Sequence, residues 1–342
     1  MSIAKKLAFS LLAVIVFFGS AEGILRLTYQ PSRPFNFYTP QPKSIVQPDA
    51  DLGYRLRPNF EGKAYLSFVK TNSLGFRGPE FAPNPRNGLR VVAIGDSCTF
   101  GFGVSDNEHT YPFQLSTLMQ NADVSAEVIN AGVVGYSSYQ ALKLLQSRVL
   151  SFHPDILLIY IGWNDMGNSL SPDWTPTFTQ GIERSHFWSN SPPYLLLALA
   201  DVISRFRPRR PLAYKTAAVD SYSINLTKIV DVARQAGIEP MLISWPTRVA
   251  LHIDRLRTTE VMPGSGITYD QWFDFYQRYQ VALRAVAAAK NVKVIPLADD
   301  LNQKDSSYYI DEIHLSDQGN SEAAAVIFDS LRPEVAGRRL SH

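Results

Sequence analysis

The sequence predicts an α/β protein with three layers, in which helices cover both faces of a mostly parallel, five-stranded sheet. From residue 89 onward, short apolar segments alternate with longer amphipathic ones along most of the chain. The short segments are mostly apolar and rich in β-branched residues, and the third of them, at 155–165, has the continuously apolar run of a strand in the middle of a parallel sheet. Strands that alternate with helices connect through right-handed crossovers, and these crossovers place helices on both faces of the sheet.

The individual elements follow from the same patterns in chain order. The expected strands, with the loop residues that directly follow them, are 89–97, 126–135, 155–165, 240–246 and 292–300. Amphipathic periodicity predicts helices at 111–122, 137–152, 221–237, 269–290 and 320–335. Gly237 closes the third of these helices, because glycine readily adopts the left-handed conformation at a helix C-terminus.

The N-terminus has the layout of an export signal. Lys5 and Lys6 precede an apolar run of about 15 residues, as in secretory signals. The small residues 19–21 offer a cleavage site before Glu22. Alternatively the run continues to residue 25 as an uncleaved anchor with the N-terminus inside, an outcome that the sequence slightly favours although a spanning helix needs about 20 apolar residues. Residues 1–26 are therefore expected to be a signal peptide or a membrane anchor, with the rest of the chain outside the cytoplasm.

The remaining chain divides into two expected parts. Residues 27–88 are rich in proline, which breaks helices, and we expect a linker and a small β-rich appendage there. Residues 89–342 form the main domain, with an insert at 166–220 that is too long for a simple connection. The insert carries many aromatic residues. It is interpreted either as a wall or lid over the substrate or as a subdomain with its own small core.

Composition excludes several classes of protein. The net charge is +2, whereas a nucleic-acid-binding protein usually carries a larger basic excess. Cys98 is the only cysteine, so neither an internal disulfide nor a cysteine metal cluster can form. The six histidines lack metal-ligand spacing. We therefore expect no metal, no cofactor and no nucleic-acid partner, and the sequence gives no indication of oligomeric state.

Reactive residues follow the predicted strands, at the sheet edge where parallel α/β proteins bind ligands. Ser97 follows the first strand, and His314 is the best candidate for the base that takes its proton. Asp311 precedes His314 by three residues and can orient the imidazole. An oxyanion requires preorganised donors, and the candidates are the backbone N–H groups of Ser97 and Gly135 and the side chain of Asn164. Such a set of groups suffices for acyl transfer.

Four sequence blocks carry a family resemblance. They are GDSCTFG, NAGVVGYSS, GWND and DEIHLS, and their order resembles that of the SGNH/GDSL hydrolase family. The resemblance covers residues 89 to about 335 and implies an SGNH or flavodoxin-like fold. It implies Ser97 as nucleophile, Asp311 and His314 as the rest of the triad, and Ser97, Gly135 and Asn164 as the oxyanion hole. Cys98 departs from the family pattern, and Gly132 is an alternative to Gly135.

The upstream segments DLGYRLRPN and NSLGFRG resemble those of exported or membrane-anchored bacterial members of this family. The leading hypothesis is a serine esterase, a carboxylic ester hydrolase that removes an O-acetyl or short acyl group from an extracytoplasmic glycan or lipid. One alternative is an O-acyltransferase that acts on a cell-envelope polysaccharide with the same triad. Another is a non-catalytic glycan-binding or assembly protein.

Overall fold

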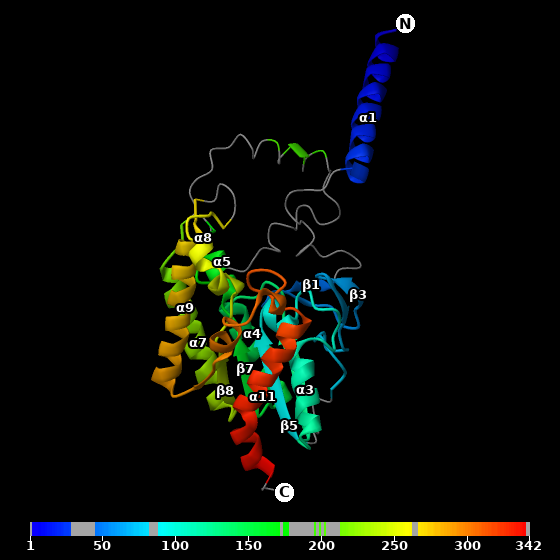
Figure 1. Ribbon diagram of the computed structural model, residues 1–342. Helices are drawn as coiled ribbons and strands as arrows, with labels where there is room; N and C mark the ends of the chain where they lie inside the picture. The colour runs from blue at the N-terminus through cyan, green and yellow to red at the C-terminus, as the bar shows by residue number, and fades with distance from the viewer. Residues whose placement is uncertain are drawn as a thin grey trace. The chain divides into compact units, whose positions relative to one another are not determined.

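A computed structural model describes residues 2–28, 45–81, 88–171, 174–177, 195, 198–199, 202, 213–261 and 266–339. The chain divides into two compact units. The first consists of residues 1–44 and 181–210, and the second of residues 45–180 and 211–342. The second unit therefore holds the predicted main domain without residues 181–210, together with the hairpins of the predicted appendage (Figure 1).

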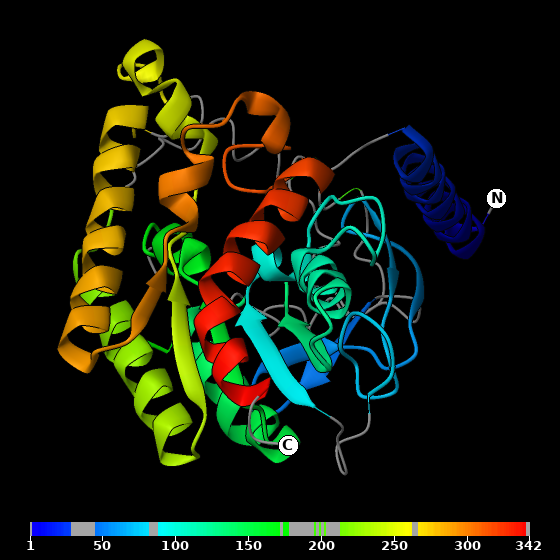
Figure 2. The ribbon, with the colours of Figure 1, turned by 60° about the horizontal axis from the view of Figure 1, so that its bottom comes forward.

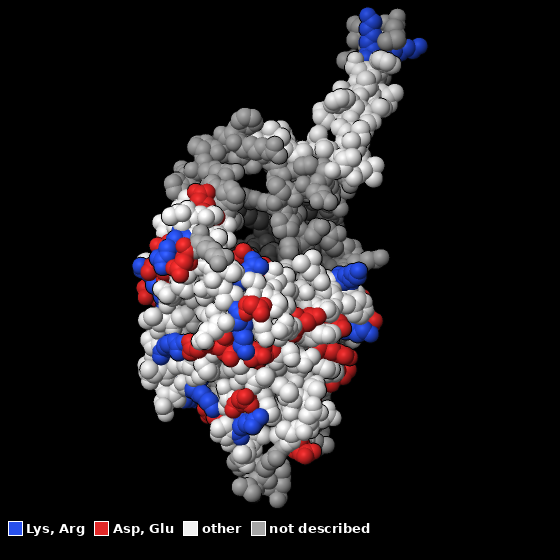
Figure 3. Space-filling view, in the orientation of Figure 1, with Lys and Arg blue, Asp and Glu red and all other residues white. Residues whose placement is uncertain are grey.

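In the first unit, a single long helix, α1, spans Ile3–Thr28. Its apolar side chains are mostly exposed, for example Phe17 and Leu27, and its exposed middle is uncharged in Figure 3. Among the described residues, however, no helix is both long enough and apolar enough to cross a membrane. The cleaved signal and the membrane anchor that the sequence allows at residues 1–26 both stay predictions.

The second unit is built on the five-stranded parallel sheet that the sequence predicts. The strand order is β6-β5-β7-β8-β9, and every neighbouring pair is parallel. The central strands β5 and β7 are buried along their whole length, so β7 is continuously apolar and Arg90, the one charged residue of β5, is paired with Glu127. The strands are β5 Leu89–Gly95, β6 Ala126–Gly132, β7 Ile156–Tyr160, β8 Glu239–Ile243 and β9 Lys293–Ile295.

Helices cover both faces of this sheet, as predicted. α3 packs against α11, which crosses in front of the strands in Figure 2. On the other face α4 packs against α7, and α7 packs against α9. The long helices are α3 Tyr111–Asn121, α4 Ser138–Ser147, α7 Ala217–Gln235, α9 Tyr269–Lys290 and α11 Asp317–Arg339. Shorter helices are α2 Ser97–Phe100, α5 Trp163–Asn168, α8 Ile253–Leu256 and α10 Leu297–Leu301, with 3₁₀ turns at Val149–Phe152, Arg248–Leu251 and Ser306–Tyr308.

Two small antiparallel hairpins precede the sheet. β1 Val46–Asp49 pairs with β2 Gly53–Leu56, and β3 Glu61–Ala64 pairs with β4 Ser67–Lys70. The sequence predicts short strands within 64–78, but residues 73–78 form turns and isolated bridges instead. Of the insert at 166–220, the structure describes residues 166–171, 174–177 and 213–220, together with four isolated positions between them. Most of its aromatic residues, including Phe187 and Trp188, lie outside the described residues.

Candidate active site

Ser97 is the first residue of the short helix α2, directly after the carboxyl end of β5. The turn between them requires Gly95, since a Cβ atom there would lie 2.1 Å from Thr99 Oγ1 and 2.3 Å from the carbonyl oxygen of Tyr160. The Asp96 side chain caps α2 by accepting a hydrogen bond from the N–H of Cys98 at 2.9 Å. Ser97 is thereby fixed at the sheet edge where the sequence predicts it.

The loop before α11 carries Asp311 and His314 and folds around the Asp311 carboxylate. Asp311 Oδ1 accepts hydrogen bonds from the N–H groups of Ile313, at 2.9 Å, and His314, at 2.8 Å. Asp311 Oδ2 lies 2.7 Å from His314 Nδ1, and His314 Nε2 lies 2.8 Å from Ser97 Oγ. Although Ser97 and His314 are 217 positions apart in the chain, the fold brings them into direct contact.

These contacts favour the ionised form of Asp311 and set the tautomer of the His314 ring. Burial opposes the ionisation of Asp311, but hydrogen bonds from His314 and from the loop outweigh it and lower the pKa of the carboxyl below its ordinary value. The ionised carboxylate can only accept, so Nδ1 of His314 carries the proton and Nε2 is left to accept the Ser97 hydroxyl. The arrangement is the one in which a histidine can remove the proton of a serine.

Two of the predicted oxyanion-hole residues, Gly135 and Asn164, follow the carboxyl ends of β6 and β7. Gly135 has a positive φ of 87° in the turn after β6, which favours glycine. The N–H groups of Ser97 and Gly135 donate to no residue that the structure describes. Asn164 Nδ2 donates one hydrogen bond to the carbonyl of Tyr136 at 3.1 Å, and its second N–H remains for another acceptor.

Gly132, the alternative donor, has a different role. Its N–H donates to Asn130 Oδ1 at 3.0 Å, so it is already used. A Cβ atom on Gly132 would lie 2.2 Å from the backbone nitrogen of Phe100. The residue is glycine because β6 passes very close to α2. This geometry favours Gly135 as the donor.

Two buried carboxyl groups, those of Asp96 and Asp165, brace the site. Asp165 accepts hydrogen bonds from the N–H of Ser138, at 2.8 Å, and from its hydroxyl, at 2.5 Å. Burial raises the pKa of Asp165 to about 7 and that of Asp96 to about 6, with the hydrogen bonds opposing the shift in each case. Cys98 is also buried, and burial raises the pKa of its thiol, so a thiolate nucleophile is disfavoured.

Sequence reasoning missed two residues that hold the site. Phe102 stacks on the imidazole of His314, with 4.4 Å between ring centroids. Arg77 lies in a stretch where an arginine is ordinarily exposed, yet it is only 2% exposed. Its guanidinium donates to the carbonyls of Phe100 and Gly101, at 3.0 and 2.7 Å, at the end of α2. Nothing in the local sequence pattern distinguishes such an arginine from an exposed one.

A cavity of about 360 Å³ opens beside the imidazole. Of the predicted site residues, Asp311 and His314 line it, and Ser97, Gly135 and Asn164 do not. Its other walls come from α5, from the start of α9 and from the two described ends of the insert. They include Trp163, Leu170, Tyr214, Tyr269, Trp272 and Glu312.

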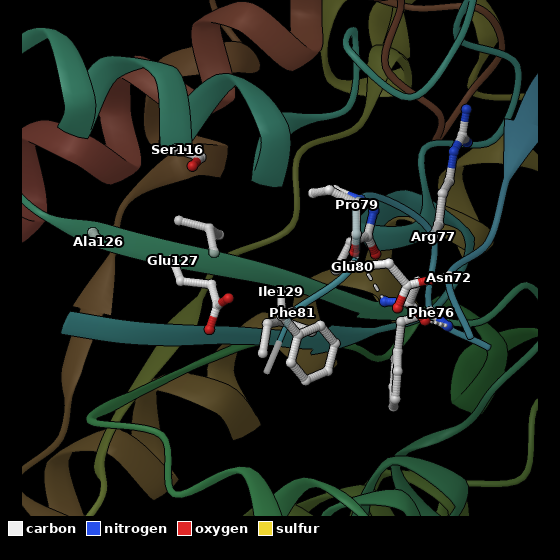
Figure 4. A pocket seen from close by; sticks show the side chains of 12 residues that line it. Asn72, Phe76, Arg77, Pro79, Glu80, Phe81, Ser116, Ala126, Glu127 and Ile129 are labelled. Carbon is white, nitrogen blue, oxygen red and sulfur yellow. Dashed lines mark hydrogen bonds between the residues drawn. The ribbon is translucent and has the colours of Figure 1, made fainter. Parts of the chain in front are cut away.

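A second cavity, of about 250 Å³, lies along the edge strand β6 (Figure 4). Asn72, Arg77, Glu80 and Glu127 are among its lining residues. None of the predicted site residues lines it, so it is separate from the Ser97 site. Among the described residues there is also no cluster of three or more His, Cys, Asp or Glu side chains that could hold a metal ion.

Comparison with known proteins identifies the family of the chain. The profile of the GDSL-like lipase/acylhydrolase family matches residues 93–321, and the chain belongs to this family. It is therefore a hydrolase of the class that acts on carboxylic esters. Among proteins with curated descriptions, none matches the chain.

Solved structures show only distant likeness. An acetyl xylan esterase, AlAXEase, has a TM-score of 0.47 and 17% sequence identity, with 71% of this chain and 100% of that chain covered. A lipase/acylhydrolase from Enterococcus faecalis has a TM-score of 0.46 and 19% identity, with 72% and 96% covered. TesA has a TM-score of 0.45 and 15% identity, with 72% and 99% covered.

Proposed function

We propose that this chain is an exported serine esterase that removes an O-acetyl or short acyl group from a glycan or lipid of the cell envelope. The observation that carries the proposal is the pair of hydrogen bonds that joins Ser97 Oγ to His314 Nε2 and His314 Nδ1 to Asp311. His314 accepts the serine proton as Oγ attacks the ester carbonyl, and Asp311 stabilises the imidazolium that forms.

The later steps use the same groups. The negative charge on the tetrahedral intermediate is stabilised by the N–H groups of Ser97 and Gly135 and by the Asn164 amide. His314 then returns its proton to the oxygen of the departing alcohol, which leaves an acyl group on Ser97. Water, activated by His314, attacks the acyl-enzyme and releases the acid.

Turnover of p-nitrophenyl acetate tests this proposal. Ser97→Ala removes the nucleophile and is expected to abolish turnover above the uncatalysed rate. Cys98→Ala, which alters the buried neighbouring side chain, is the matched control and is expected to remain active. Equal turnover by wild type and Ser97→Ala would contradict the proposal, and so would loss of activity confined to Cys98→Ala.

The proposed location rests on the N-terminal sequence, in which Lys5 and Lys6 precede the apolar run. Alkaline phosphatase, which is active only after export, can be fused behind residue 44 in a bacterial host. We expect an active fusion, and an active fusion that persists after deletion of residues 1–26 would contradict export through this segment.

A further inference from the structure

We infer that the cavity beside His314 binds a sugar ring that carries the ester, so that the alcohol part of the substrate is a glycoside rather than a lipid. The inference rests on the proposed esterase function and narrows its substrate. It depends on where the cavity lies, on its aromatic walls and on a carboxylate at its rim.

The position of the cavity indicates which half of the ester it holds. His314 must deliver its proton to the oxygen of the leaving alcohol, so the alcohol lies on the imidazole side of the reacting carbon. The carbonyl oxygen points instead toward the donors at Ser97, Gly135 and Asn164. Because the cavity is lined by Asp311 and His314 but not by those three donors, it receives the alcohol rather than the carbonyl end.

Rigid aromatic rings form one wall of the cavity. Trp163 and Trp272 both line it and lie nearly parallel, with 5.7 Å between ring centroids and 17° between planes. Tyr276 stacks nearly parallel on both of them. Trp163 is only 5% exposed, so this wall is held by packing and loses little freedom when a ligand binds. A pyranose ring has flat faces of C–H groups that pack on aromatic surfaces of this kind.

The rim adds a polar group that a lipid chain could not satisfy. Glu312 lines the cavity, and its side chain is 41% exposed. Arg248 donates to Glu312 Oε1 at 3.1 Å, and the Tyr269 hydroxyl lies 3.5 Å from the same oxygen. Oε2 has no partner among the described residues and remains an acceptor for a ligand hydroxyl. Covering this carboxylate with a hydrocarbon chain would cost free energy, since its bonds to water would be lost without replacement.

Cavity size is consistent with a ring rather than a small alcohol. A volume of about 360 Å³ lies within the range for small-molecule sites, roughly 300–1,000 Å³. An aromatic wall, a carboxylate acceptor and this volume together fit a single glycosyl unit. Trp272 and Glu312 are then specificity-determining residues.

Four acetate esters that differ only in the alcohol test the inference on the full-length chain. They are methyl 6-O-acetyl-glucoside, cyclohexylmethyl acetate, octyl acetate and ethyl acetate. A hydrogen bond to a charged group corresponds to a factor of roughly 10 to 100, so we expect kcat/KM for the glucoside to exceed that for cyclohexylmethyl acetate by at least about tenfold. Glu312→Gln should reduce this preference by about tenfold, because the amide is a weaker acceptor.

Trp272 is tested separately, because it supplies the stacking surface. Trp272→Leu should lower the ratio of kcat/KM for the glucoside to that for ethyl acetate by about fivefold, and Trp272→Phe should restore most of it. Glu322→Gln on α11 is the matched control, because Glu322 pairs with Lys304 and does not line the cavity. It should leave every ratio unchanged.

The outcomes separate this inference from the proposed function. If the wild type hydrolyses none of the four esters, the esterase function fails. If it hydrolyses them but prefers octyl acetate, or if Glu312→Gln and Trp272→Leu leave the ratios unchanged, the sugar site is wrong while the esterase function stands. If the Trp272 variants instead change the preference for ethyl octanoate over ethyl acetate, the cavity holds the acyl chain.

Discussion

Arg77 joins the segment after the N-terminal hairpins to the end of α2, the helix that begins with Ser97. Its replacement by methionine should lower the free energy of unfolding of the protein. The side chain is 2% exposed, and it donates to the carbonyls of Phe100 and Gly101 and to Asn107 Oδ1 at 2.9 Å. A hydrogen bond from a charged donor contributes about 1.5–3 kcal/mol, and contributions from one group are not additive. We therefore expect the free energy of unfolding to fall by about 4 kcal/mol.

Urea unfolding followed by tryptophan fluorescence measures this change. Arg77→Lys keeps the charge but cannot reach all three acceptors, so it should lose about half as much. The matched control is Arg284→Lys, since Arg284 makes an exposed ion pair with Asp299 that contributes little. A loss below about 1 kcal/mol in Arg77→Met would refute the reasoning, because the hydrogen bonds of the guanidinium would then contribute little to stability.

Three further predictions concern the site itself. Asp311→Asn keeps an acceptor for the loop N–H groups but removes the charge that orients His314, so kcat should fall about a thousandfold while the fold persists; a loss below tenfold would argue against the role. Phe102→Leu removes the ring stacked on His314 and should lower kcat several-fold with little change in KM, whereas an unchanged kcat would show that the stacking is incidental. For Asp165, the pKa is about 7 in the folded chain and near its ordinary 3.8 in the unfolded chain, so between these pH values only the folded chain holds the proton. Asp165 should therefore make stability fall as pH rises from about 4 to 7, by an amount on the order of 4 kcal/mol, and Asp165→Asn should remove this part and leave the smaller slope that Asp96, with a pKa of about 6, contributes; equal slopes in the two proteins would contradict the assignment.

The parallel sheet could be predicted because its signals are local. A strand buried on both faces is mostly apolar: β7 is apolar along its whole length, and in β5 the one charged residue, Arg90, is paired with Glu127. Reactive residues that directly follow such strands must meet at one edge, which is how Ser97 and Asn164 could be placed. The role of His314 could be predicted from the sequence block DEIHLS and its family resemblance. In the structure, His314 Nε2 lies within hydrogen-bond distance of Ser97 Oγ.

What the sequence did not reveal depends on contacts between distant segments. Arg77 lies in a proline-rich stretch where a surface position is the ordinary expectation, and its burial depends on the distant end of α2. Trp272 has helical spacing that suits a core residue as well as a cavity wall. The hairpin β1–β2 includes Pro48, which argues against a strand except at an edge.

The most direct test of the central claim is labelling of the wild-type chain with a fluorophosphonate, followed by mass spectrometry of the digested protein. The account predicts one adduct, on Ser97, and much slower labelling in His314→Ala, because only a serine whose proton is accepted by His314 reacts rapidly. An adduct on another residue, or labelling of Ser97 that is equally fast without His314, would contradict it.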